Sequence, residues 1–150
     1  MKLKTLFESN YENNIILKHD DCVGNKLPTD LPATIIGDFM CISANLTSLK
    51  GCPSEIGGRF TCQGNKLTSL KGIEYQIKSI GGDFECAFNE ITSHILGLML
   101  IQIDGDIITE LGSGTDVDEI LNKWKNQGRK GVFGASKDLL DLGYKELAQI

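Results

Sequence analysis

Apolar and polar residues recur in one order through the middle of the chain, with a period of 21 to 24 residues. A phenylalanine is followed two positions later by a cysteine, then by leucine or isoleucine, and then by Thr-Ser; the phenylalanines are Phe39, Phe60 and Phe84. Side chains two positions apart in a strand leave the same face. Each Phe-x-Cys pair therefore predicts a short strand with both side chains in the core.

The residues after each predicted strand suit a turn and a return to the core. An asparagine follows each of the three cysteines, preceded by a glycine after Cys62, and an asparagine side chain can bond to nearby backbone groups in a turn. The leucines of each Leu-Thr-Ser-Leu run then point inward. One such unit cannot bury its own apolar face, whereas stacked units share a core, with parallel strands about 4.8 Å apart.

Weaker copies extend the pattern at both ends. Residues 22–32 match 62–72, and residues 101–111 fit if Ile101 takes the phenylalanine place and Ile103 the cysteine place. The sequence therefore predicts an α/β fold, a parallel-strand solenoid of about five rungs. The solenoid spans residues 16–111, after an N-terminal cap at 1–15 with a short helix from Lys2 to Glu8, and before a C-terminal helical cap at 112–150.

The C-terminal segment changes to a helical pattern. Thr115 is the expected N-cap of a helix that ends at Gly128, and its apolar stripe consists of Val117, Ile120, Leu121 and Trp124. Residues 128–137, "GRKGVFGASK", are expected to form a connecting loop. Ser136 would cap a second helix that buries Leu139, Leu140 and Leu142. The two helices either seal the last unit or form a separate docking module.

The repeated unit resembles the leucine-rich repeat family, and most of all its short bacterial and phage variants, in its F-x-C strands and N-x-L-T-S-L turns. "NKLPTDLP" at 25–32 is similar to the repeats of bacterial effectors. Ala44 stands at the usual asparagine place and His94 at a usual leucine place, so Ile95 is expected to pack instead. The resemblance implies a phage- or bacterium-encoded factor that binds and modulates a host protein, with the sheet face as its binding surface.

Residues that alternate with the core positions define the candidate binding face. Exposed apolar side chains bordered by charge suit a protein partner, although an acidic, solvated sheet would show the same pattern. The outer units would add Asp21, Val23, Gln102 and Asp104. The candidate partner-binding residues are Asp38, Met40, Ile42, Arg59, Thr61, Gln63, Asp83 and Glu85.

Composition narrows the class of partner. A net charge of −5 argues against binding to a nucleic-acid backbone. The longest apolar stretch, residues 95–103, is interrupted by Gly97 and Gln102, so no membrane span is expected. The N-terminal residues lack the apolar core of a signal peptide, and a cytoplasmic protein is therefore expected. An odd count of five cysteines predicts free thiols, with Cys52 the most open to modification.

No motif for catalysis, a metal or a cofactor is complete in the sequence. His19 and His94 lie in no recognisable triad or ligand pattern, and the "DGD" and "DVD" segments lack the rest of a calcium loop. A non-catalytic protein-binding module without cofactor is therefore expected. Two alternatives remain open, an assembly protein that associates through an end of the solenoid and an enzyme with scattered acids such as Asp83 and Glu85; the oligomeric state is undecided.

Overall fold

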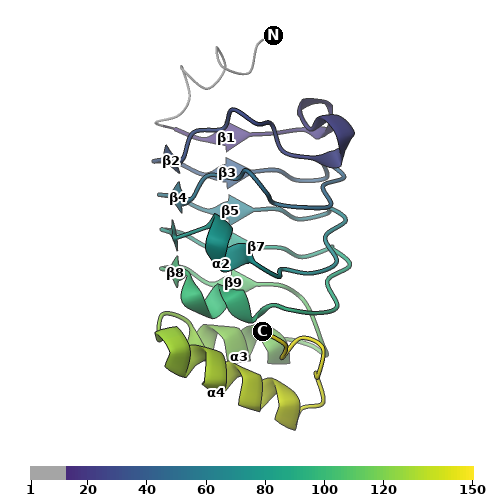
Figure 1. The fold of residues 1–150 in the computed structure, drawn as a ribbon, viewed down its shortest axis with the longest axis vertical. Coiled ribbons are helices and arrows are strands. Elements are labelled where there is room, and N and C mark those ends of the chain that lie inside the picture. Colours follow the sequence, from purple (N-terminus) through teal and green to yellow (C-terminus); the bar gives the residue numbers. More distant parts are fainter. Residues whose placement is uncertain (1–12) are drawn as a thin grey trace.

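The computed structural model describes residues 13–150, so the expected helix from Lys2 to Glu8 lies outside the described residues. The fold is α/β, with two parallel sheets and C-terminal helices (Figure 1). Successive strands alternate between the sheets. The five-stranded sheet contains β1 (Ile15–Ile16), β3 (Phe39–Met40), β5 (Phe60–Thr61), β7 (Phe84–Glu85) and β9 (Ile107–Ile108). The four-stranded sheet contains β2 (Thr34–Ile35), β4 (Glu55–Ile56), β6 (Ser79–Ile80) and β8 (Gln102–Ile103).

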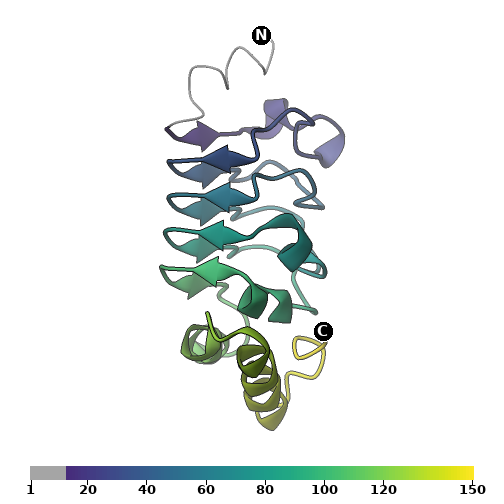
Figure 2. The ribbon, with the colours of Figure 1, turned by 60° about the vertical axis from the view of Figure 1, so that its left-hand side comes forward.

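Short helices complete the chain. Among residues 13–150, 3₁₀ segments lie at His19–Asp21, Val23–Asn25 and Leu96–Leu100, and a single helical turn, α2, lies at Ile73–Gln76. The C-terminal helices are α3 (Asp116–Trp124) and α4 (Gly128–Asp141). Figure 2 shows the two sheets meeting along one side of the stack, with α2 on another side.

The predicted Phe-x-Cys pairs form the core, as expected. Phe39 pairs in register with Phe60, and Phe60 with Phe84. Their ring centroids are 5.3 and 5.5 Å apart, in edge-on and tilted arrangements that aromatic pairs favour. The cysteines two residues later are buried as well. The period-2 pattern therefore identified the inward face of these strands correctly.

A tight corner of three residues leads from each strand of the four-stranded sheet to the next strand of the five-stranded sheet. Its second residue is glycine, at Gly37, Gly58, Gly82 and Gly105. A Cβ on Gly58 would lie 2.9 Å from the carbonyl carbon of Gly37, and one on Gly82 would lie 2.9 Å from the backbone nitrogen of Arg59. Real Cβ atoms do not approach backbone so closely. The corner can stack only because these positions carry no side chain.

Two asparagines bond neighbouring units together behind the strands. The Asn65 side chain accepts from the amides of Ala44 and Leu46, at 3.0 and 2.9 Å, and donates to the Cys41 carbonyl at 2.7 Å. Asn89 accepts from the Leu67 amide in the same manner, at 3.0 Å. Ala44 is buried at the asparagine place of its own unit, so the ladder does not extend there, as the sequence indicated.

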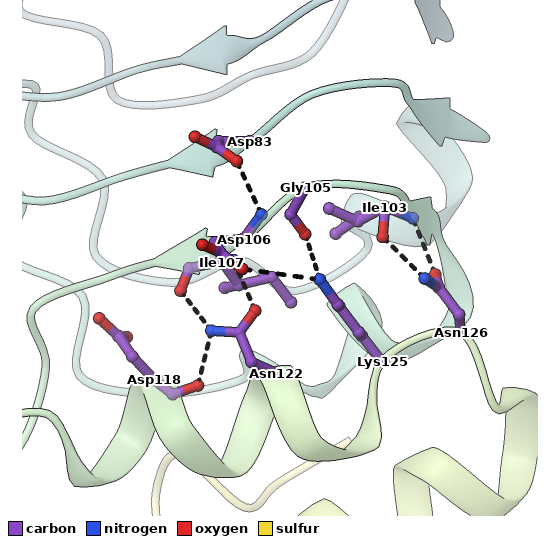
Figure 3. A network of polar contacts seen from close by, with 9 residues as sticks. All are labelled: Asp83, Ile103, Gly105, Asp106, Ile107, Asp118, Asn122, Lys125 and Asn126. Atoms are coloured by element: carbon purple, nitrogen blue, oxygen red, sulfur yellow. Dashed lines mark hydrogen bonds and ion pairs between the residues drawn. The ribbon is translucent and has the colours of Figure 1, made fainter.

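The C-terminal edges of both sheets are closed by side chains of α3 and the residue pair after it (Figure 3). The Asn122 amide accepts from the Ile107 N–H at 2.8 Å and donates to its carbonyl at 2.9 Å. Asn126 does the same for Ile103, at 2.8 and 2.7 Å, and Asp118 accepts from the Thr109 amide at 2.9 Å. These side chains occupy the place of the next strand, so α3 caps the C-terminal ends of both sheets.

The outer units differ from the prediction in register. Ile107, not Ile101, pairs with Phe84, and Ile103 pairs with Ile80 in the other sheet. The first strand is β1, so Asp21 and Val23 lie in 3₁₀ segments and not on a sheet face. Gln102 belongs to β8 of the four-stranded sheet, and Asp104 lies at the corner after it. Those four residues are therefore not part of the expected face.

The expected loop at 128–137 was wrong, because α4 begins at Gly128. A Cβ on Gly134 would overlap the ring of Trp124, and one on Gly131 would overlap its carbonyl oxygen, so these glycines allow the two helices to approach closely. Ser136 lies within α4 and donates to the Ala148 carbonyl at 3.3 Å instead of capping a helix. Leu139 is buried as expected, whereas Leu140 and Leu142 are exposed.

Replacing a corner glycine should destabilise the fold more than replacing a glycine in open space. We expect Gly82→Ala to lower the free energy of unfolding by roughly 3 kcal/mol, because its Cβ would force the stacked backbones apart. The matched control is Gly114→Ala, where φ is +66° and no heavy atom lies within 4 Å; its cost should be about 1 kcal/mol. Urea denaturation measures both, and equal losses would contradict the steric account of the corner.

Removing the donor of Asn122 should open one edge of the five-stranded sheet. We expect Asn122→Asp to destabilise by about 1–3 kcal/mol, because a carboxylate can accept from Ile107 but cannot donate to its carbonyl. The deficit should shrink as the pH falls, since protonation of the introduced carboxyl restores a donor. Gln127→Glu adds the same charge at an exposed site and should change stability by less than about 0.5 kcal/mol. A pH-independent deficit would argue against this account.

Candidate functional site

The outer face of the five-stranded sheet is the candidate site. The second residue of each strand points away from the core, and parallel pairing places these residues in one row. Each of the five strands contributes one residue to the row. The residues are apolar at the two ends of the row and polar in its middle. They are Ile16, Met40, Thr61, Glu85 and Ile108.

The polar centre of the face is internally bonded. Glu85 Oε2 accepts from the Thr61 hydroxyl at 2.8 Å and from the Gln63 amide at 2.6 Å. Thr61 is only 3% exposed, although the sequence placed it on the binding surface. These hydrogen bonds pair the polar groups of Thr61, Gln63 and Glu85 with one another. The three side chains are therefore less available to a partner than expected.

The charged residues at the corner also connect units. Asp38 Oδ1 accepts from the Arg59 backbone amide at 2.7 Å, and the Arg59 guanidinium lies 3.9 Å from the Asp38 carboxylate. Asp83 Oδ1 accepts from the Asp106 amide at 2.7 Å. Asn14 makes the equivalent bond to Asp38, at 2.8 Å. Asp38, Arg59 and Asp83 therefore lie beside the sheet face, and their bonds hold neighbouring units together at the corner.

An apolar patch remains on the N-terminal half of the face. It consists of Ile16, Met40 and Ile42; Ile16 pairs with Met40, and Ile42 follows Met40 by two residues on the same face. Ile16 is 55% exposed and Ile42 44% exposed. Ile16 was not among the predicted site residues because no strand was expected at 15–17, although Ile15 and Leu17 alternate with it and are buried. Met40 and Ile42 of the predicted site therefore join Ile16 in a patch of side chains that, unlike those of Thr61, Gln63 and Glu85, cannot form hydrogen bonds within the sheet.

The acidic and histidine side chains of the described residues are not arranged as a single centre. Asp83 and Glu85, the pair singled out for catalysis, bond to different partners. His94 Nδ1 lies 2.9 Å from the hydroxyl of the adjacent Ser93, and His19 lies on a separate unit. Within residues 13–150, no group of three His, Cys, Asp or Glu side chains is placed to hold a metal ion.

The prediction that Cys52 is open to modification was wrong, whereas the prediction of free thiols is confirmed. All five are free and buried, as the predicted core column required of Cys41, Cys62 and Cys86. Cys52, expected to be open to modification, is only 8% exposed. Burial raises its pKa to about 12, and a protonated thiol is a poor nucleophile.

Comparisons with known proteins assign no family to the chain. A scan against family models, a search of curated proteins and a search of solved structures each gave no match. In the part of the chain that the structure describes, no helix has the length and apolar character required to cross a membrane. The function must therefore be inferred from the geometry and chemistry of this chain.

The native protein should resist thiol reagents and lose stability in alkali. Burial raises the thiol pKa of Cys52 from the ordinary 9.0, and those of Cys41, Cys62 and Cys86 as well. The unfolded chain therefore loses thiol protons at lower pH than the native chain, and the free energy of unfolding falls as the pH rises above about 9. Denaturation curves at several pH values measure the fall.

The same property is tested by alkylation with iodoacetamide at neutral pH. Native protein should show almost no modification by mass spectrometry, while protein in guanidinium chloride should take up label at all five cysteines. Rapid, selective labelling of Cys52 in the native protein would contradict its burial.

Proposed function

We propose that this chain is a non-catalytic protein-binding module, built as a short solenoid of the leucine-rich-repeat type. The observation that carries the proposal is the apolar patch on the N-terminal half of the sheet face, in which Ile16 and Ile42 are exposed and Met40 is half-buried. Apolar side chains clustered on a surface and bordered by charge are typical of protein interfaces. Here the border is formed by Asp38 and Arg59, which lie 3.9 Å apart.

The backbone under the patch is already fixed by hydrogen bonds, so a partner can bind without a change in its conformation. Met40 lies between β1 and β5, and the flanking amides of Phe39 and Cys41 bond to carbonyls of the next unit at 2.8 and 2.9 Å. A partner that docks on such a surface does not have to order the backbone first, which lowers the entropic cost of association. This rigidity supports a role in recognition.

The resemblance of the repeated unit to short bacterial and phage leucine-rich repeats supports the choice of partner. The in-register rows of phenylalanine and the asparagine bonds between units agree with that resemblance. We therefore propose that the partner is a protein of the host cell, bound in the cytoplasm by a phage- or bacterium-encoded factor. Association through the C-terminal edge would require displacement of the Asn122 and Asn126 bonds, which disfavours assembly at that edge.

The proposal is tested by affinity capture from host lysate with patch variants. We expect Met40→Glu and Ile42→Glu each to reduce the captured partner at least about tenfold, because a carboxylate would be desolvated in an apolar interface. Leu140→Glu introduces the same charge at an exposed leucine of α4 and should leave capture unchanged. Unchanged capture by both patch variants would contradict this choice of face, and a stable homo-oligomer without partner would favour the assembly alternative.

A further inference from the structure

A second surface, remote in sequence from the apolar patch, is hollowed out beside α2. A cavity of about 270 Å³ lies where α2, the 3₁₀ segment Leu96–Leu100 and the C-terminal residues come together. Figure 1 shows α2, the helical turns of the following unit and the C-terminus on the same side of the stack. Its lining includes Glu74, Tyr75, Gly97, Leu100, Val132 and Ile150, and we call it the Glu74 cavity.

Glu74 has a feature that the fold does not explain. Its Oε2 atom is buried and has no hydrogen-bond partner among residues 13–150. The oxygen lies against Gly97, where a Cβ would overlap it, so the glycine makes room for the carboxylate. A buried carboxylate oxygen without a donor is costly. Glu74 as a whole is only half-buried and lines the cavity, so a donor that enters the cavity and bonds to its carboxylate would offset this cost.

No cation of the described chain fills this role. Lys71 also lines the cavity, but it forms no ion pair with Glu74 among the contacts of residues 13–150. The other ion pairs of the described residues join different groups. Among residues 13–150, no cation of the chain pairs with the Glu74 carboxylate.

The walls of the cavity indicate which cation fits. Tyr75 is 85% exposed beside Glu74, and Leu100 and Ile150 are exposed at the same site. An exposed aromatic ring attracts a guanidinium group through its face, and apolar walls suit the methylene stem of a long basic side chain. Arginine combines this stem with a planar group that donates to a carboxylate and stacks on a ring.

We propose that the Glu74 cavity binds an arginine side chain of a protein partner. Glu74 accepts hydrogen bonds from the guanidinium, Tyr75 stacks on it, and Leu100 and Ile150 contact the stem. The site is separate from the apolar patch, none of whose residues line the cavity. Its occupation would give the chain a second contact point with a partner, selected by charge, whereas the patch of Ile16, Met40 and Ile42 is apolar.

The test uses the peptide acetyl-Leu-Arg-Leu-amide with the full chain, followed by ¹H–¹⁵N NMR titration. We expect shifts at the amides of Gly97 and Leu100. The matched peptide with citrulline in place of arginine has nearly the same shape without the charge, and it should bind at least about tenfold more weakly. Glu74→Gln and Tyr75→Ala should each weaken binding of the arginine peptide, whereas Glu90→Gln, at an exposed glutamate, should not.

The melting temperature of Glu74→Gln and peptide binding by Met40→Glu distinguish this proposal from a structural role of Glu74 and from failure of the sheet face. Glu74→Gln should leave the melting temperature unchanged or raised, because it removes an unpaired carboxylate, while a purely structural role for Glu74 would lower it. Met40→Glu should retain peptide binding, so failure of the sheet face and failure of the cavity are distinguishable. Equal binding of the two peptides, an undiminished affinity in Glu74→Gln, or no shift at millimolar arginine peptide would each overturn the proposal.

Discussion

The structure depends on the stacking of parallel backbone segments at hydrogen-bonding distance. Strands in neighbouring units lie about 4.8 Å apart, and this spacing has to hold at the corner as well as in the strands. At Gly58 and Gly82 a Cβ would meet the backbone of the preceding unit. The spacing thus selects glycine at the corner and allows large side chains inside, where the rings of Phe39, Phe60 and Phe84 pack in edge-on and tilted arrangements.

Stacking of this kind creates a difficulty at its ends, because the last strand has no neighbour for its amides and carbonyls. The chain resolves it at the C-terminal end with a helix. Asp118 and Asn122 are four residues apart and project from one side of α3. Asn126 follows the end of the helix with a positive φ of 63°, in the left-handed region, and bonds the edge of the other sheet. The two asparagines each donate and accept, as a strand residue would, and the edge is satisfied without a further strand that would invite pairing with another chain.

The stacking of units also explains which parts of the structure could be predicted from the sequence and which could not. The phenylalanine rows could be predicted because a period of two is a property of the strand alone. Isoleucines at 101, 103, 107 and 108 fit two registers, and the Gly-Asp pair before Ile107, which also precedes Phe39 and Phe84, was the signal that would have decided between them. The helix at 128–141 could not be found from local propensity, because its glycines are explained by contact with Trp124. Thr61 was assigned to the surface because its bond to Glu85 depends on register between units 24 residues apart.

The bonds between units also determine which side chains remain for function. Most polar residues of the predicted face are used in stacking, as the bonds of Asp38, Asp83 and Glu85 show. Residues whose chemistry stacking does not explain are therefore the better candidates for recognition. Ile16 and Ile42 are apolar although exposed, and Glu74 is charged although its oxygen is buried. Each departs from what its environment within the chain favours, and in each case contact with a second molecule would remove the mismatch, by covering apolar surface or by supplying a donor.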